Sequence, residues 1–426
     1  MKNLQPKEFC EFIIIKKYIR KYLIKHGKQR VFVRKVHVAE KKWLYKRRSR
    51  NVEMDDKTVV FETFMGRQYG CNPRAIYEYM LSDPTFKDFK YIWIFNDPKS
   101  KTDIFPQLEG VETLSKEDRA YYGKMASAKY VITNSNLDYG VTPGEGQVFL
   151  QTWHGTPLKR LRCDIAAEHG NAINSIDEIH SKNNLDVVRY DYFLSPSPFA
   201  TDKFRTAFNL EALGKATILT ETGYPRNDIL FNYREEDVVK LKEELGIPAD
   251  KKVILYAPTF RDNKHDGKDY VYDLNMDMDL MQKELGDEYV MLFRVHYFVA
   301  DNFDFSKYEG FVYNVTALDD ISQLYIISDL LITDYSSVFF DFANLRRPIV
   351  FYMYDKEDYA DDIRGFYIDL EELPGPIVTE EKDLISEIKN IDPGKWTDKF
   401  NEFNKKYNPL EDGNSSRRVV ELLFGK

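Results

Sequence analysis

Cysteine is scarce in this sequence of 426 residues. Cys10, Cys71 and Cys163 stand far apart and form no CxxC pair, which argues against a disulfide framework or a structural zinc site and fits a reducing cytosol. Long apolar runs are missing as well. No run is long enough to span a bilayer, and the longest early run, residues 12–15, is too short for the core of a signal peptide.

The sequence also lacks the common signatures of metal and dinucleotide binding. No cluster of His, Cys, Asp and Glu has metal-ligand spacing, and no Asp-x-Asp pair follows a predicted strand. Asp277 and Asp279 have that spacing, but they fall in a predicted helix and are interpreted as surface charge. The glycine-bearing loop 66–72 does not match the dinucleotide-binding pattern GxGxxG. Its position allows it to approach a ligand, and a plain turn is the alternative. We therefore predict chemistry without a metal ion or another cofactor, in which cations and helix dipoles hold phosphate groups.

Positive charge is concentrated at the N-terminus. Residues 1–50 hold 17 basic and 3 acidic residues, a net charge of +14, whereas the rest of the chain has 44 basic and 66 acidic residues, a net charge of −22. Apolar residues recur in this basic segment at helical spacing, at Phe9, Phe12, Ile13, Ile19, Tyr22 and Leu23. We predict a basic amphipathic helical arm over residues 1–55 that binds an anionic membrane surface. An ordinary solvated helix face and a nucleic-acid contact are the alternatives; because no DNA- or RNA-binding motif occurs elsewhere, we expect no nucleic-acid partner.

The length of the chain and the order of its segments predict two α/β domains. Two domains of about 150–200 residues plus extensions fit 426 residues. Strand-like and helix-like segments alternate, which favours parallel sheets covered by helices on both faces. We place the first Rossmann-like domain at residues 56–228, the second at 229–392 and a helical tail at 393–426, which packs on either domain. The turn-rich stretch 221–228 falls at the junction, where we expect it to line a cleft between the domains.

The predicted strands are short and mostly apolar. Those of the first domain lie at residues 58–64, 91–95, 130–133, from 148 onward and at 192–195. Those of the second domain lie at residues 252–257, 289–293, 329–333 and 348–352.

Residues 148–161 place a histidine at a strand end. The segment begins β-prone and is broken by Gly155 and Pro157, so His154 should lie where a strand meets a loop, at the carboxyl edge of the sheet. Lys159 and two arginines follow within a few residues. A histidine that can move a proton near neutral pH would therefore lie beside cations that can hold an anion. The alternative is a strand-end histidine followed by a solvated basic helix start.

The stretch from Thr333 to Ser337 joins a strand to a helix in the second domain. Hydroxyls and free backbone N–H groups at such a junction bind phosphate, so we interpret Thr333, Ser336 and Ser337 as phosphate ligands. Ordinary capping by Asp334 or Ser336 is the alternative. Asp341, about two turns further on, either reaches a ligand hydroxyl or faces solvent.

Two other strands of the second domain also end in polar residues. Arg294 and His296 are two positions apart, so an extended backbone points both to the same face. A cation beside a histidine suits the stabilisation of a phosphoryl group and of a departing phosphate, although an ion pair at a strand end would show the same pattern. At the end of the 252–257 strand, Thr259 and Phe260 could seat a nucleobase, with Arg261 near phosphate.

Together these motifs resemble the CDP-glycerol glycerophosphotransferase family, which makes teichoic acids and related polyol-phosphate polymers. The similarity extends over residues 58–390. It is carried by Trp153-His154-Gly155-Thr156-Pro157-Leu158-Lys159, Tyr256-Ala257-Pro258-Thr259-Phe260-Arg261, Arg294-Val295-His296 and Thr333-Asp334-Tyr335-Ser336-Ser337 with Phe340-Asp341. Similar shorter stretches are residues 72–77, 222–226 and 365–367. Family members often have proline where Tyr297 follows His296, which affects the shape of that loop.

The resemblance implies a GT-B-like fold, with two Rossmann-type domains facing a central cleft, and peripheral attachment to the cytoplasmic face of the cell membrane. It also implies that a hydroxyl of a lipid-linked acceptor attacks the phosphorus nearest the polyol of a CDP-polyol and releases CMP. On this basis His154 is the expected general base, His296 and Arg294 steady the diphosphate and the leaving CMP, and Ser336 and Ser337 bind phosphate.

Three questions stay open at the level of sequence. Glycerol phosphate is favoured over ribitol phosphate as the transferred group, but no residue decides between them. A cell-envelope glycosyltransferase that uses a nucleotide sugar on the same scaffold is the main alternative, and a non-catalytic membrane scaffold is a weaker one. The oligomeric state is undetermined, so self-association into a homo-oligomer is neither predicted nor excluded.

Overall fold

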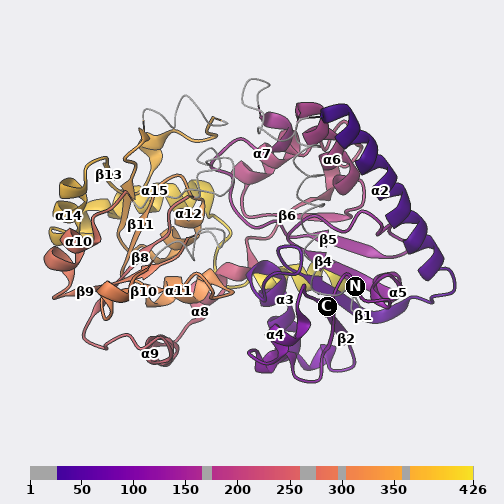
Figure 1. Cartoon of the computed structure of the whole chain (residues 1–426), viewed down its shortest axis with the longest axis horizontal. Helices are drawn as coiled ribbons and strands as arrows, with labels where there is room; N and C mark the ends of the chain where they lie inside the picture. The colour runs from indigo at the N-terminus through magenta and orange to yellow at the C-terminus, as the bar shows by residue number, and fades with distance from the viewer. Residues whose placement is uncertain (1–25, 166–174, 260–274, 296–303, 357–364, 426) are drawn as a thin grey trace, which may run out of the picture.

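The computed structural model describes residues 26–165, 175–259, 275–295, 304–356 and 365–425. Figure 1 shows two α/β lobes side by side along the long axis of the molecule. Each lobe is built around one sheet in which every strand pair is parallel. The predicted α/β fold with two parallel sheets is therefore confirmed.

The first lobe contains a seven-stranded sheet in the order β3-β2-β1-β4-β5-β6-β7. Its strands are β1 (Asp55–Glu62), β2 (Lys90–Ile94), β3 (Glu112–Leu114), β4 (Ala128–Thr133), β5 (Val148–Gln151), β6 (Tyr192–Ser195) and β7 (Leu219–Glu221). Its helices are α3 (Cys71–Ser82), α4 (Pro98–Thr102), α5 (Tyr121–Ser127), α6 (Ile176–Val187) and α7 (Pro198–Ala207). The central strands are apolar on both faces because helices cover both sides of the sheet.

The second lobe contains a six-stranded sheet in the order β10-β9-β8-β11-β12-β13. Its strands are β8 (Lys252–Tyr256), β9 (Tyr289–Phe293), β10 (Val312–Asn314), β11 (Leu330–Thr333), β12 (Ile349–Tyr352) and β13 (Ile377–Val378). Its helices are α8 (Ile229–Asn232), α9 (Glu235–Glu244), α10 (Met278–Leu285), α11 (Ile321–Ile327), α12 (Val338–Phe342) and α14 (Glu381–Lys389).

Both sheets reverse their strand order at the equivalent place. In the first lobe β1 lies between β2 and β4, and in the second β8 lies between β9 and β11. The loops that leave the carboxyl ends of β1 and β4, and of β8 and β11, therefore run to opposite sides of their sheet. Ligands of open α/β sheets bind in the crevice that such a switch point leaves.

The predicted strands are present, but the sequence missed the short edge strands β3, β7, β10 and β13. These have two or three residues each, which is too short to show an alternating or continuous apolar pattern. The strand predicted at residues 58–64 begins three residues earlier and ends at Glu62, because Phe64, Met65 and Gly66 all have positive φ. The domain boundaries at 56–228 and 229–392 remain predictions.

The C-terminal tail contacts both lobes. Helix α15 (Thr397–Tyr407) buries Phe400, Phe403 and Tyr407 in the core of the second lobe. Helix α16 (Ser415–Phe424) then returns to the first lobe, where Val419 and Val420 join the core beneath α3. The sequence had left open which lobe the tail joins, and the structure divides it between the two.

The described part of the N-terminal arm is one long helix, α2 (Gly27–Arg48), which lies along the outer side of the first lobe (Figure 1). Arg30 and Arg34 bind the buried Glu178 of α6, and Tyr45 packs edge-on against Tyr122 of α5 with ring centroids 5.6 Å apart. Residues 1–25 lie outside the described residues. Among the helices that the structure does describe, none combines the length and the apolar character needed to cross a bilayer.

A buried ion pair joins the two lobes. Arg226 lies in the 3-10 turn η6 (Pro225–Asn227) between the lobes, and its Nη2 donates to both carboxylate oxygens of Asp341 in α12 at 3.0 and 2.8 Å. The side chains of Arg226 and Asp341 are only 7% and 6% exposed. Asn227 adds a third hydrogen bond to Asp341 at 3.1 Å. The stretch predicted to line an interdomain cleft therefore contributes a residue that joins the two lobes.

We predict that Asp341→Ala lowers the stability of the whole molecule by about 3–5 kcal/mol, because it leaves the Arg226 guanidinium buried without a counter-charge. Urea denaturation followed by circular dichroism measures this. The control is Glu244→Ala, which removes one partner of the exposed Lys240–Glu244 pair and should cost less than about 1 kcal/mol. Equal, small effects of the two substitutions would show that the buried pair does not secure the lobes.

Candidate active site

A cavity of about 530 Å³ lies where the two lobes meet. The first lobe supplies residues 153–159 and Leu161, which follow β5. The second lobe supplies Pro258 and Thr259 after β8, and residues 335–337 after β11. The carboxyl ends of both sheets thus face one space. Of the residues predicted from sequence, the structure brings His154, Lys159, Thr259, Ser336 and Ser337 together here.

His154 is held in one orientation by its surroundings. Its Nδ1 lies 2.8 Å from the main-chain oxygen of Asn134, at the end of β4. Because a carbonyl can only accept a hydrogen bond, Nδ1 carries the proton and Nε2 has the free lone pair. The ring lies between Trp153, 4.3 Å away between centroids, and Phe64, 5.6 Å away. Trp153 has φ 52°, a conformation in which tertiary contacts must hold a bulky residue.

The environment of His154 favours its neutral form. Burial lowers the pKa of His154 to about 4; the hydrogen bond to Asn134 opposes this shift, and the nearby cations Arg226 and Arg162 add to it. Arg162 stacks on Trp153 and donates to Asn136 at 2.7 Å, so its charge is fixed close to the histidine. An unprotonated imidazole at neutral pH can accept a proton.

The backbone at Gly155 passes close to Ser337 of the second lobe. A Cβ atom on this residue would lie 3.0 Å from the Ser337 hydroxyl, closer than nearly all real Cβ contacts. A larger residue here would require Ser337 to shift by a few tenths of an ångström, so glycine suits the close approach of this residue to Ser337. The Gly155 carbonyl also accepts a hydrogen bond of 3.1 Å from the buried hydroxyl of Tyr224.

On the second-lobe side, the loops after β8 and β11 are joined by hydrogen bonds. Asp334 Oδ1 accepts from the backbone N–H of Thr259 at 2.7 Å, and the Thr333 hydroxyl donates to the Ala257 carbonyl at 2.7 Å. Thr333 is 1% exposed and is not among the residues that line the cavity. Its hydroxyl therefore shapes the strand ends, while Ser336 and Ser337 face the cavity.

Two further predicted residues that the structure describes, Asp341 and Arg294, do not line the cavity. Asp341 is buried, and its carboxylate accepts hydrogen bonds from Arg226 and Asn227. Arg294 Nη1 donates to the carbonyls of Val315 and Leu318, at 3.2 and 2.8 Å, and burial lowers its pKa. Its guanidinium thus positions the loop after β10. His296 and Arg261 lie outside the described residues, so their predicted roles stay predictions.

A second bridge between the lobes closes one side of the cavity. Residues 158–161 of the first lobe run antiparallel to residues 365–367 of the second, with Tyr367 N–H donating to the Leu158 carbonyl at 2.8 Å and Arg160 N–H to the Gly365 carbonyl at 3.0 Å. Lys159 is held on this bridge opposite Phe366. The bridge explains why the basic residues after His154 form no helix: their backbone groups pair with the other lobe.

Sequence reasoning missed two residues of the site. Tyr335 lines the cavity and stacks on Phe366, with ring centroids 5.8 Å apart. Asn134 orients His154. The sequence did contain a signal for Asn134. A threonine ends both β4 and β11, and a polar residue follows it directly in each case, Asn134 in the first lobe and Asp334 in the second.

Comparisons with known proteins agree with this architecture. The family described as CDP-glycerol:poly(glycerophosphate) glycerophosphotransferase matches residues 44–425. The chain is 43% identical to a teichoic acid poly(glycerol phosphate) polymerase of Bacillus subtilis over 86% of its own length and 48% of that protein. It is 39% identical to a teichoic acid glycerol-phosphate transferase of Staphylococcus aureus, over 86% of this chain and 92% of that protein. It therefore spans about half of the first relative and nearly all of the second.

The solved structure of the wall teichoic acid polymerase TagF superposes with a TM-score of 0.81 at 35% sequence identity, covering 96% of this chain and 97% of that chain. This likeness extends over both lobes and confirms the predicted GT-B-like fold. The resemblance inferred from the motifs is confirmed too: this chain belongs to the CDP-glycerol:poly(glycerophosphate) glycerophosphotransferase family.

Proposed function

We propose that this protein transfers glycerol phosphate from CDP-glycerol to a hydroxyl of a lipid-linked acceptor or of a growing teichoic-acid-type chain, with release of CMP. The observation that carries the proposal is the oriented His154, whose pKa is lowered by burial, in a cavity that Ser336 and Ser337 also line. The relatives support the choice of glycerol. Four whose names state glycerol phosphate are 37–43% identical to this chain, whereas those named for ribitol phosphate are 29–38% identical and align over less of it.

The chemistry follows from the placement of these groups. His154 Nε2 removes the proton from the acceptor hydroxyl as its oxygen attacks the phosphorus nearest the glycerol. The bond between that phosphorus and the bridging oxygen breaks, and CMP leaves with the bridging oxygen. The hydroxyls of Ser336 and Ser337 and the charge of Lys159 stabilise the negative charge on the transferred phosphate.

The remaining predicted residues complete the donor site in this proposal. Thr259 lies in the cavity wall, where its loop can receive the nucleotide. Arg261 and His296 are assigned to the diphosphate and the departing CMP on the resemblance alone. Arg294 and Asp341 act indirectly, because their side chains hold the surrounding loops and the lobe interface.

The test is CMP release by the purified protein, offered CDP-glycerol and CDP-ribitol separately with a lipid-linked acceptor. We expect release with CDP-glycerol. His154→Ala should lower turnover by about 10²–10⁴-fold, the usual contribution of a positioned base, without loss of the fold. His37→Ala, an exposed histidine of α2, is the matched control and should retain activity.

Release with CDP-ribitol alone would change the substrate but keep the reaction class. Release of a nucleoside diphosphate from a sugar donor, with no CMP from either CDP-polyol, would support the glycosyltransferase alternative. Near-normal turnover by His154→Ala would remove the proposed base.

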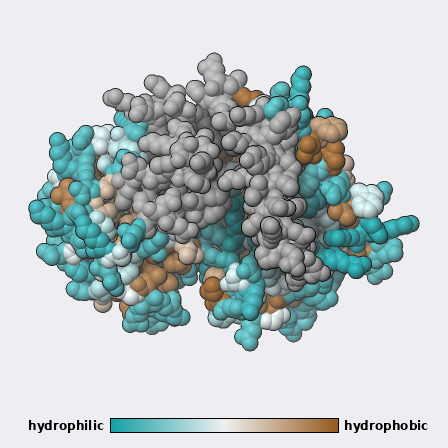
Figure 2. Space-filling view, in the orientation of Figure 1, coloured by the Kyte–Doolittle hydropathy of each residue, from teal (hydrophilic) through white to brown (hydrophobic). Residues whose placement is uncertain are grey.

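We further propose that α2 attaches the protein peripherally to the cytoplasmic face of the membrane. Phe32, Val36 and Trp43 are 68%, 53% and 58% exposed, on a helix that also carries many lysines and arginines. Figure 2 shows brown, hydrophobic surface among teal over this outer side of the first lobe. Apolar side chains that enter the headgroup region, together with cations that attract anionic lipid, are the two components of such binding.

Replacement of Phe32, Val36 and Trp43 by serine should weaken binding to phosphatidylglycerol vesicles at least about tenfold, because each buried apolar side chain contributes more than about 1 kcal/mol. Flotation of the protein with vesicles measures this. The control replaces Phe231 and Val239, which are similarly exposed on the second lobe. A similar loss of binding in the control, or none in the α2 variant, would place the membrane contact elsewhere.

A further inference from the structure

In both lobes, a side-chain hydrogen bond joins the loops that leave the two strands at the switch point of the sheet. In the first lobe, Asn134 Oδ1 accepts from the backbone N–H of Phe64 at 2.8 Å, joining the loops after β4 and β1. In the second, Asp334 Oδ1 accepts from the backbone N–H of Thr259 at 2.7 Å, joining the loops after β11 and β8. Each of these residues follows a threonine that ends its strand. Asn134 and Asp334 are therefore equivalent positions, one an amide and the other a carboxylate.

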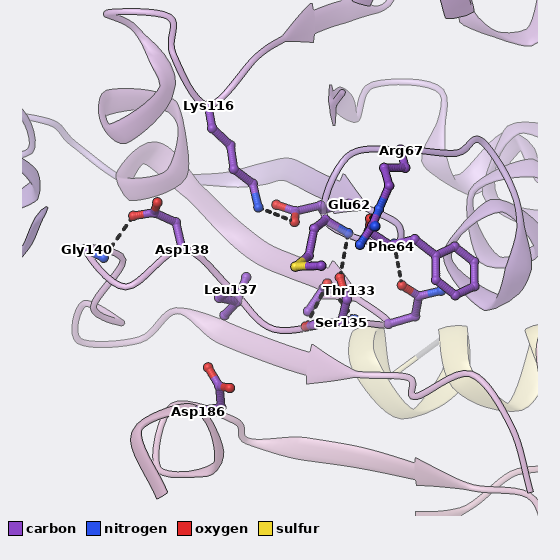
Figure 3. A network of polar contacts seen from close by, with 12 residues as sticks. Glu62, Phe64, Arg67, Lys116, Thr133, Ser135, Leu137, Asp138, Gly140 and Asp186 are labelled. Carbon is purple, nitrogen blue, oxygen red and sulfur yellow. Dashed lines mark hydrogen bonds and ion pairs between the residues drawn. The ribbon is translucent and has the colours of Figure 1, made fainter. Parts of the chain in front are cut away.

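Two side-chain hydrogen bonds, accepted by Asn134 and Ser135, connect the loop after β4 to the loop after β1. Ser135 Oγ accepts from the backbone N–H of Met65 at 2.8 Å, so the Asn134–Ser135 pair holds a turn in which Phe64 and Met65 have φ 45° and 60°. Figure 3 shows Phe64, Thr133 and Ser135 gathered at this junction. On the same sheet edge Glu62 is paired with Lys116 at 2.6 Å (Figure 3).

Hydrogen bonding alone does not explain the amide at position 134. The side chain of Asn134 is fully buried, and its Nδ2 has no hydrogen-bond partner among the residues that the structure describes. An aspartate could accept from Phe64 N–H equally well, as Asp334 accepts from Thr259. The relevant difference is charge.

The charge matters because Asn134 also contacts His154 through its main chain. A carboxylate at this position would be buried beside the imidazole and would stabilise its protonated form. The charged groups that act on His154, Arg162 of η3 (Arg162–Asp164) and Arg226 of η6, both favour the neutral form. Because the asparagine amide carries no charge, it does not oppose the effect of these two arginines on the pKa of His154. At the equivalent position of the second lobe the chain has a carboxylate, Asp334.

We propose that Asn134 is a positioning residue for the reaction: its main-chain oxygen orients the His154 ring, its side chain fixes the Phe64 turn against that ring, and the absence of charge on this side chain is a requirement of the site. This rests on the proposed role of His154 as a base.

The test compares Asn134→Asp with Asp334→Asn, which exchange amide and carboxylate at the equivalent positions. A base acts in its neutral form, so activity falls as pH drops through the pKa of His154, about 4 in the native protein. In Asn134→Asp the added negative charge should move the acid limb of the kcat/KM profile upward by at least about one pH unit, with activity recovered at higher pH. Asp334→Asn should lower kcat/KM by loosening the Thr259 loop without moving the acid limb.

A second measurement separates this proposal from the proposed function. The protonation of His154 can be followed by NMR, with the His154 signal assigned from its absence in His154→Gln. A raised pKa in Asn134→Asp but not in Asp334→Asn supports the inference even if no CMP is released, an outcome that would instead reject the proposed reaction. If Asn134→Asp changes neither the pKa of His154 nor the acid limb of the kcat/KM profile, the inference is overturned and Asn134 has a structural role only. If Asn134→Asp does not fold, Asn134→Ala serves: it should lower kcat while the acid limb stays in place, and a shifted limb would contradict the argument from charge.

Discussion

The buried ion pair between Arg226 and Asp341 joins the two lobes, and residues of both lobes together form the candidate active-site cavity. Arg226 also donates its backbone N–H to Asn72 Oδ1 at 3.1 Å, and Asn72 Nδ2 donates to the carbonyls of Thr152 and Trp153 at 3.2 and 3.1 Å. A continuous chain of buried contacts thus runs from α12 of the second lobe to the residue before His154. Separating two such buried charges from each other is costly, which favours the relative position of the lobes seen in the structure.

The same ion pair affects the chemistry. Burial is the main cause of the low pKa of His154, and the charge of Arg226 adds to it even though Asp341 balances that charge. The neighbouring carboxylates are affected as well: burial raises the pKa of Glu411 to about 8, and Asp341 and Asp228 add to that shift. Glu411 accepts a hydrogen bond from the Tyr224 backbone at 2.9 Å. The interface therefore gathers charged side chains that are largely buried from solvent.

The two lobes share one hydrogen-bonding arrangement at their switch points, but it positions different functional groups in each lobe. In each, a polar side chain after the strand beyond the switch point fixes the loop that leaves the first strand. In the second lobe this arrangement places Ser336 and Ser337 at the cavity, which suits an anion. In the first lobe it places an aromatic ring and a main-chain oxygen around a histidine, which suits proton transfer.

The sequence predicted the longer strands, the order of the motifs and the cavity residues His154, Lys159, Thr259, Ser336 and Ser337, because the carboxyl ends of parallel strands share one edge of a sheet. The inward position of Asp341 and Thr333 and the contact between Asn134 and His154 became apparent only in the folded structure. These roles depend on partners distant in the chain: Arg226 and Asp341 are 115 positions apart, and Thr333 and Ala257 are 76 apart. A strand-end pattern shows which polar groups arrive at an edge. Which of them face the ligand and which hold the scaffold is settled by burial and by the partners that packing brings within hydrogen-bonding distance.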